Sequence, residues 1–206
     1  MTACHFVVPN ALNTRETQEI GQMKGGNLKQ TMGRGVKCLK HWTRKRNATI
    51  IYDSTVDRFT ADGIFEKVKG KENIAVIAFT TDGDVFGGYY NVAVTKQGKS
   101  FYDPDMFLFS LQSHGRCKTP QQFVVDKWMK KESHVAFWKT EHCGFVVFRV
   151  KFESGCLLGN DRLDSVCVKM SKGFKGLEDT TLTGQNSTWD GPYFHCARLI
   201  AIQFFN

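Results

Sequence analysis

The sequence predicts a mainly β chain with a few helices (α+β), built as a two-sheet antiparallel β-sandwich. Three observations support this fold class. Short apolar runs separated by turn residues recur along most of the chain, as they do in sandwiches and barrels. Only one segment of the body, FTADGIFEKVKG (59–70), carries clear helix punctuation. The 206 residues include 17 Phe against only 4 Pro, which indicates a well-filled core.

The first elements of the body are an expected strand and an expected helix. ATIIYDS (48–54) is a short apolar run that ends in turn residues, which predicts a strand. In the helical segment that follows, Thr60 can cap the N-terminus and Asp62 suits the positive end of the helix dipole. Gly70 can end the helix. Its narrow apolar face must pack on a larger element.

The next two segments predict a hairpin. NIAVIAFT (73–80) is almost continuously apolar, so we expect a strand with both faces buried. TTDGD then supplies an Asp-Gly turn, which tolerates the positive φ angles that tight hairpins need. VFGGYYNVAV (85–94) is expected as the returning strand, with alternate residues on opposite faces.

Gly87 and Gly88 raise the question of a phosphate-binding loop. Such loops lie between a strand and a helix, where free backbone N–H groups at the helix N-terminus meet the phosphate. Here no helix pattern follows, and no lysine or Ser/Thr stands in Walker spacing. Glycine inside a strand marks a bulge, or a close approach by another backbone or a bulky ring. We therefore interpret the pair as architectural.

The remaining expected elements are strands separated by loops, and Pro104 interrupts the chain before one of them. They are MFLFSL (106–111), a hairpin of HVAFWKT (134–140) and GFVVFRVKF (144–152), DSVCVKM (164–170), a long ordered loop (171–195) and CARLIAIQFF (196–205).

The net charge of the chain is concentrated in one window. Between Glu19 and Asp53 there are eight basic residues and no acidic one. The whole chain has 28 basic and 20 acidic residues, so its entire charge of +8 lies in this window. We expect residues 1–45 to form a basic N-terminal extension, partly helical or flexible, and residues 46–206 to form the folded domain.

The basic window is open to several interpretations. One interpretation is nucleic-acid binding, in which the cations neutralise phosphates and Trp42 stacks on a base. In addition, TRKR (43–46) is similar to a nuclear-import signal. Contact with an anionic membrane is another alternative. The remaining alternative is a solvated segment, or a helix that packs Val36, Leu39 and Trp42 against the sandwich. The candidate anion- or nucleic-acid-binding residues are Arg34, Lys37, Lys40, Trp42, Arg44, Lys45 and Arg46.

No catalytic motif is present, and we expect no enzyme, no cofactor and no metal. G-x-S-x-G, H-E-x-x-H and Walker sequences are absent. Three His–Cys pairs, His114/Cys117, His142/Cys143 and His195/Cys196, could bind zinc only if they converged in space. Adjacent residues of a strand point to opposite faces, which argues against it. Asp103-Pro104-Asp105 is interpreted as a turn.

Cysteine usage indicates a reducing compartment. The seven cysteines are odd in number and lack a C-x-x-C spacing. No secretory signal or membrane-spanning run is recognisable, so we expect a cytoplasmic protein, with the nucleus as an alternative. Cys38, flanked by Lys37 and Lys40, is the best candidate for a redox-active thiol. Cys156 and Cys167 are expected to be inert core residues.

DGDVFGGYYNVAV (82–94) followed by DPDMFLFSL (103–111) resembles the signature of the TLDc domain, and the likeness extends over roughly residues 46–206. The resemblance implies a two-sheet β-sandwich without recognised catalytic residues. It also implies an interaction module that acts in oxidative-stress resistance, with the vacuolar proton-pumping ATPase as a partner. The alternative is a nucleic-acid-binding nuclear regulator, a stress-responsive transcription factor that uses the basic extension. The structural motif residues are Phe86, Gly87, Gly88, Tyr89, Phe107 and Phe109.

Overall fold

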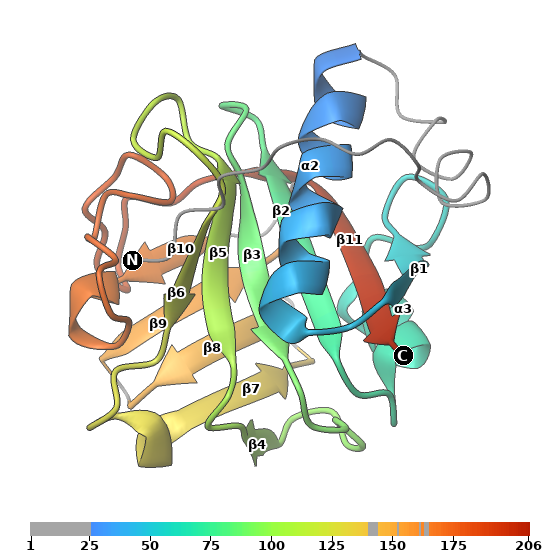
Figure 1. Ribbon diagram of the computed structural model, residues 1–206. Coiled ribbons are helices and arrows are strands. Elements are labelled where there is room, and N and C mark those ends of the chain that lie inside the picture. The colour runs from blue at the N-terminus through green and yellow to red at the C-terminus, as the bar shows by residue number, and fades with distance from the viewer. Residues whose placement is uncertain (1–25, 140–143, 152, 161, 163–164) are drawn as a thin grey trace.

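The computed structural model describes residues 26–139, 144–151, 153–160, 162 and 165–206, and these residues form two antiparallel sheets flanked by helices (Figure 1). This confirms the mainly β, two-sheet sandwich. The helices are α2 (Gly26–Thr43) and α3 (Ala61–Val68), with short 3-10 turns η1 (Lys130–Glu132) and η2 (Met170–Lys172). The first sheet has the order β1 (Asn47–Asp53), β11 (Cys196–Phe205), β2 (Ile74–Thr80), β3 (Val85–Tyr90), β5 (Phe107–Gln112), β6 (Gln121–Val124). The second has the order β10 (Val166–Val168), β9 (Ser154–Leu158), β8 (Val146–Val150), β7 (Ser133–Phe137), β4 (Ser100–Tyr102).

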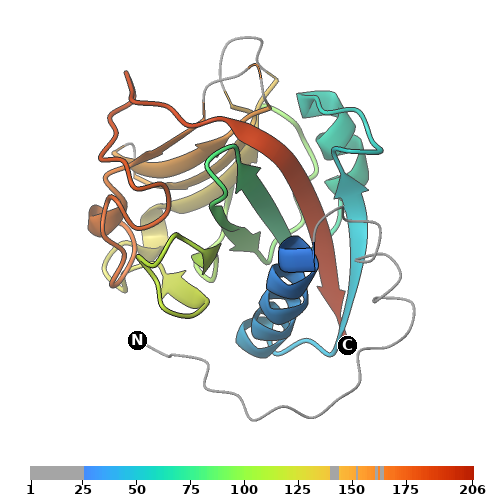
Figure 2. The same ribbon diagram turned by 90° about the horizontal axis from the view of Figure 1, so that it is seen from above.

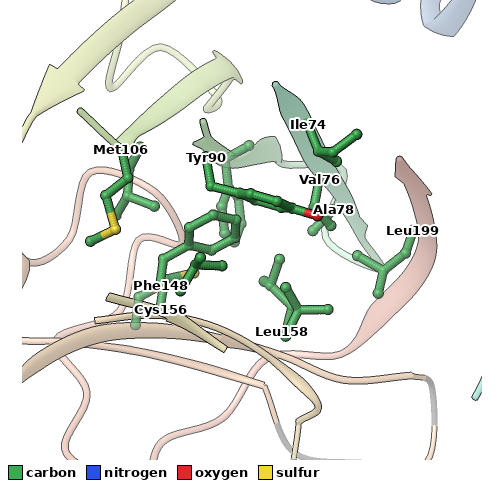
Figure 3. Close-up of a cluster of buried hydrophobic side chains, with 14 of the residues drawn as sticks. Ile74, Val76, Ala78, Tyr90, Met106, Phe148, Cys156, Leu158 and Leu199 are labelled. Carbon is green, nitrogen blue, oxygen red and sulfur yellow. The ribbon is translucent and has the colours of Figure 1, made fainter. Parts of the chain in front are cut away.

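The main core lies between the two sheets. Tyr90 of β3 and Phe148 of β8 meet there, with ring centroids 6.4 Å apart. Figure 3 shows these rings between Val76 of the first sheet and Leu158 of the second. Because side chains alternate along a strand, the other face of the first sheet is left to be covered by something else.

Helix α2 covers the outer face of the first sheet, on the side away from the second sheet (Figure 2). Met32, Val36 and Leu39 recur at helical spacing, and all three are buried. They form a second apolar cluster with residues of the first sheet that include Tyr89 and Phe109. All seven residues of β2 are buried, which confirms the strand expected to be buried on both faces.

The punctuation expected around α3 is present. The Thr60 hydroxyl accepts a hydrogen bond from the Gly63 amide at 3.1 Å, so Thr60 is the N-cap. Gly70 follows the last turn in a left-handed conformation, with φ +71°. The hairpin of β2 and β3 is also confirmed, and Gly83 takes the positive φ of its turn (+84°).

Gly87 and Gly88 lie where β3 is crowded from two directions. A side-chain carbon on Gly87 would overlap the carbonyl oxygen of Val76 on the neighbouring strand. One on Gly88 would lie 2.6 Å from the Phe148 ring across the core. Neither glycine has a positive φ, so lack of space rather than backbone conformation requires them. The close approach by a backbone and by a ring is therefore confirmed.

Several strands differ from the sequence-based expectation. The returning strand, expected to reach residue 94, ends at Tyr90. The amide of Asn91 donates to the carboxylate of Asp103, and the carbonyl of Val94 accepts from Gly70, so the chain leaves the sheet. The edge strands β4 and β6 were not predicted, because each has only three or four residues and no clear apolar alternation.

Candidate functional site

The basic residues proposed as an anion-binding cluster lie on α2 and just beyond it, and the structure divides them. Lys37 is exposed on the helix and lines neither of two hollows that the other residues of the cluster line. Arg34 lines one of these hollows. The other, here called the basic hollow, has a volume of about 480 Å³ and is lined by Lys40, His41, Trp42, Arg44, Lys45, Arg46 and Gln122.

The way in which α2 ends gathers four cations at the basic hollow. The helix stops at Thr43, and Arg44 takes a left-handed conformation with φ +57°. The amide of Lys45 then donates to the carbonyl of Lys40 at 3.1 Å, and the chain turns toward β1. Cations are favoured at this position because the C-terminus of a helix carries partial negative charge. No acidic side chain lines the hollow.

Trp42 is the aromatic residue of the basic hollow, and the first sheet holds its ring. The ring centroid lies 6.3 Å from that of Phe107, edge to face, and 6.5 Å from that of Phe109. The side chain is half-buried against the outer apolar cluster. Its indole nitrogen is buried and has no hydrogen-bond partner among the described residues. Much of the ring is thus engaged in holding α2 on the sheet.

The hollow that Arg34 lines has a volume of about 360 Å³ and lies between α2 and the chain after β5. Beside this hollow lies a cluster of charged and polar side chains that the sequence analysis did not predict. Asp84, buried just before β3, lies 2.9 Å from Nδ1 of His114 and 2.6 Å from Nη2 of Arg116. Arg116 also donates to the carbonyls of Thr181 and Leu182. No local pattern links residues about 30 positions apart, so the sequence carried no signal for this group beyond an Asp-Gly-Asp turn.

The cysteines differ in what surrounds them. Cys38, the proposed redox thiol, is only 4% exposed, whereas a reactive thiol needs access to solvent. Cys156 and Cys167 stand opposite each other on β9 and β10, with sulfurs 3.2 Å apart. We call them the buried thiol pair. Burial raises the pKa of Cys167 well above its usual range, and the neighbouring thiol adds to the effect.

The groups that suggested a metal or catalytic site do not converge in the described part of the chain. No three His, Cys, Asp or Glu side chains there are placed to hold a metal ion. His195, which precedes β11, is exposed, whereas Cys196, the first residue of that strand, is buried. His142 and Cys143 lie outside the described residues.

Asp103 lies in a turn, as its sequence context suggested. Its carboxylate accepts from the backbone amides of Asn91 and Asp105. Burial nevertheless raises the pKa of Asp103 above its ordinary value, since the desolvation of the carboxylate outweighs these hydrogen bonds. The group caps backbone amides where β3 and β5 meet the turn, which is a structural role.

Comparison with models of protein families gives a match. The model of the TLDc domain family matches residues 29–174, which is well over half of the chain and includes most of α2. No curated protein matches the chain. Neither of the described helices has the length and apolar character needed to cross a membrane.

Proposed function

The chain belongs to the TLDc domain family, and from this premise we propose that it is a non-catalytic interaction module in resistance to oxidative stress. Its proposed partner is the vacuolar proton-pumping ATPase. The protein would then act in the cytoplasm. The family match over residues 29–174 is the observation that carries this function.

The character of the described residues supports a binding role. The glycine pair of the family signature is required for packing between strands and between sheets. Buried titratable groups such as Asp103 and Asp84 are occupied by backbone amides or by cations. What the domain offers to other molecules is its surface, and surface recognition is the activity that we assign to it.

The pump interaction can be tested with the tagged full chain. Solubilised vacuolar membranes are passed over the immobilised protein, and retained pump subunits are identified together with the ATP hydrolysis rate of the eluate. In parallel, the chain is expressed in cells that lack their own TLDc proteins, and survival in hydrogen peroxide is scored. We expect pump retention and improved survival. Improved survival without pump retention would reject the pump as the partner. The absence of both effects would reject the proposed function.

A second candidate function, nucleic-acid binding by a nuclear regulator, is favoured by the basic hollow. Lys40, Arg44, Lys45 and Arg46 line one concavity that no acidic side chain lines. Side chains so placed can contact successive phosphates of one backbone. Because Trp42 is half-buried against the first sheet, we expect phosphate contacts to contribute more to nucleic-acid binding than base stacking does.

The nucleic-acid candidate is tested by fluorescence anisotropy with labelled duplex DNA across a salt series. Four engaged phosphates predict a log–log salt slope of roughly −3.6. A variant with Arg44→Glu and Arg46→Glu should bind with a much shallower slope, and Lys37→Glu serves as the control outside the hollow. Binding that is sequence-independent and lost at physiological salt would reject the regulator.

A further inference from the structure

Trp128 lies at the tip of the turn that follows β6, and its side chain is held away from the protein. The residue is 79% exposed, and only Val56 (78%) compares with it among the large hydrophobic side chains that the structure describes. Asp126 fixes the turn, because its carboxylate accepts from the Trp128 amide at 2.9 Å and its carbonyl accepts from the Met129 amide at 2.8 Å. Met129 packs against the main core. The turn is thus anchored on one side while the indole projects into solvent.

Lysines lie next to this indole and on segments that are hydrogen-bonded to the chain on either side of its turn. The Lys127 ammonium lies 4.6 Å from the Trp128 ring centroid. Backbone hydrogen bonds bring in lysines that are distant in sequence, since the Lys151 amide donates to Glu132 and the Lys175 amide to Val124. We define the Trp128 tip as Lys127, Trp128, Lys130, Lys131, Lys151 and Lys175.

The acidic groups near the tip neutralise only part of its charge. Asp105 pairs with Lys130 at 3.2 Å, and the Asp126 carboxylate accepts from the backbone of the turn. Glu132 is exposed in η1. Against these three carboxylates the tip carries five lysines, of which Lys127, Lys131, Lys151 and Lys175 are exposed. Counted over these five lysines and three carboxylates, the tip is net cationic.

An exposed tryptophan with one lysine on its ring and further lysines on adjoining segments has the chemistry of a membrane-surface contact. Indole rings concentrate at the level of the lipid headgroups, where one edge is apolar and the other polar. Lysine stems lie along apolar surface while their ammonium groups reach anionic headgroups. We propose that the Trp128 tip attaches this protein to membrane surfaces that contain anionic lipids. The turn with η1 and the C-terminal end of α2 lie toward the same lower end of the molecule in Figure 1, so the basic hollow adds positive charge at that end.

The test is co-sedimentation of the full chain with phosphatidylcholine vesicles, with and without phosphatidylserine. We expect binding only to the phosphatidylserine vesicles, and weakening as salt rises. Trp128→Ala should weaken the partitioning roughly ten-fold, because the apolar contact is lost. The single variants Lys127→Gln and Lys131→Gln should each weaken the partitioning about five-fold. Val56→Ala, an equally exposed residue next to Asp57, should leave binding unchanged.

Three results would overturn the proposal. The first is the absence of binding to either kind of vesicle. The second is equal binding by the wild type and by Trp128→Ala, with thermal melting showing that both are folded. The third is binding that survives the tip variants and disappears in the Arg44→Glu, Arg46→Glu variant, which would assign membrane contact to the basic hollow. Since the vesicles contain no protein, the result is independent of the proposed pump interaction.

Discussion

Replacement of Gly88 by Ala tests the physical role of the glycine pair. The added carbon would lie 2.6 Å from three atoms of the Phe148 ring, well inside van der Waals contact. Phe148 is fully buried and cannot swing into solvent. Overpacking of this kind costs up to about 3 kcal/mol. The lower entropy of the unfolded alanine chain offsets roughly 0.5–1 kcal/mol, which leaves a net loss of about 2 kcal/mol.

The assay is thermal and urea unfolding of the single and double variants. A loss of about 2 kcal/mol lowers the Tm of a chain of this size by roughly 4–8 °C. Phe148→Leu alone should cost ~1–2 kcal/mol, but in combination it removes the ring that the new methyl meets. The double variant should therefore be more stable than the sum of the two losses predicts, by about 1 kcal/mol or more.

The neighbouring glycine supplies the matched control. In Gly87→Ala the obstacle is the carbonyl oxygen of Val76, a backbone atom that no side-chain change can remove. Phe148→Leu should therefore not rescue Gly87→Ala. If Gly88→Ala were as stable as the wild type, or if the Gly88 double variant were simply additive, the crowding argument for the family signature would be refuted.

Three other predictions follow from buried contacts. Leu39→Ala should destabilise the protein by about 2–5 kcal/mol, because the side chain is fully buried beneath α2, while exposed Lys37→Ala should have little effect in the same melts. Arg198→Gln should lower stability at neutral pH: burial raises the pKa of Asp53, but hydrogen bonds from Arg198 and Thr55 outweigh it and leave that pKa below its ordinary value. A carboxyl group whose pKa is lowered by folding stabilises the fold at pH values above its pKa in the unfolded chain, about 3.9. The free energies of urea unfolding of the wild type and the variant should therefore converge as the pH falls through the pKa of the folded state. The buried thiol pair should resist a thiol reagent in the folded protein and react after unfolding, since both groups are buried and the pKa of Cys167 is raised.

The parts of the fold that were predictable from sequence depend on local patterns. The N-cap at Thr60 and the turn at Gly83 use residues that act within a few positions of themselves. The continuous apolar character of β2 indicates burial on both faces, whatever the covering element is. The crowding at Gly87 and Gly88 was predictable in kind, because glycine weakens a strand interior unless a bulge or a close neighbour requires it there.

Partners distant in sequence could not be predicted. Nothing local indicates that β11 inserts between β1 and β2, or that Asp84 meets His114 and Arg116. Charge counting identified the basic residues of the candidate site but not their arrangement. Arg34 and Lys40 are six positions apart on the helix, a rise of roughly 9 Å, and they line different hollows. The Trp128 tip is likewise assembled by loops whose lysines lie far apart in the chain.

Helix α2 determines how the basic residues have to be studied. The charge pattern divides the chain after residue 45, but the same helix that carries the cations also buries Met32, Val36 and Leu39 against the first sheet. Deleting the helix would uncover the outer face of that sheet, so any loss of binding could follow from unfolding alone. Substitution of exposed cations keeps the apolar contact and changes only the charge. A loss of binding in Arg44→Glu, Arg46→Glu with unchanged Tm would thus assign the interaction to the basic hollow, a conclusion that no truncation can support.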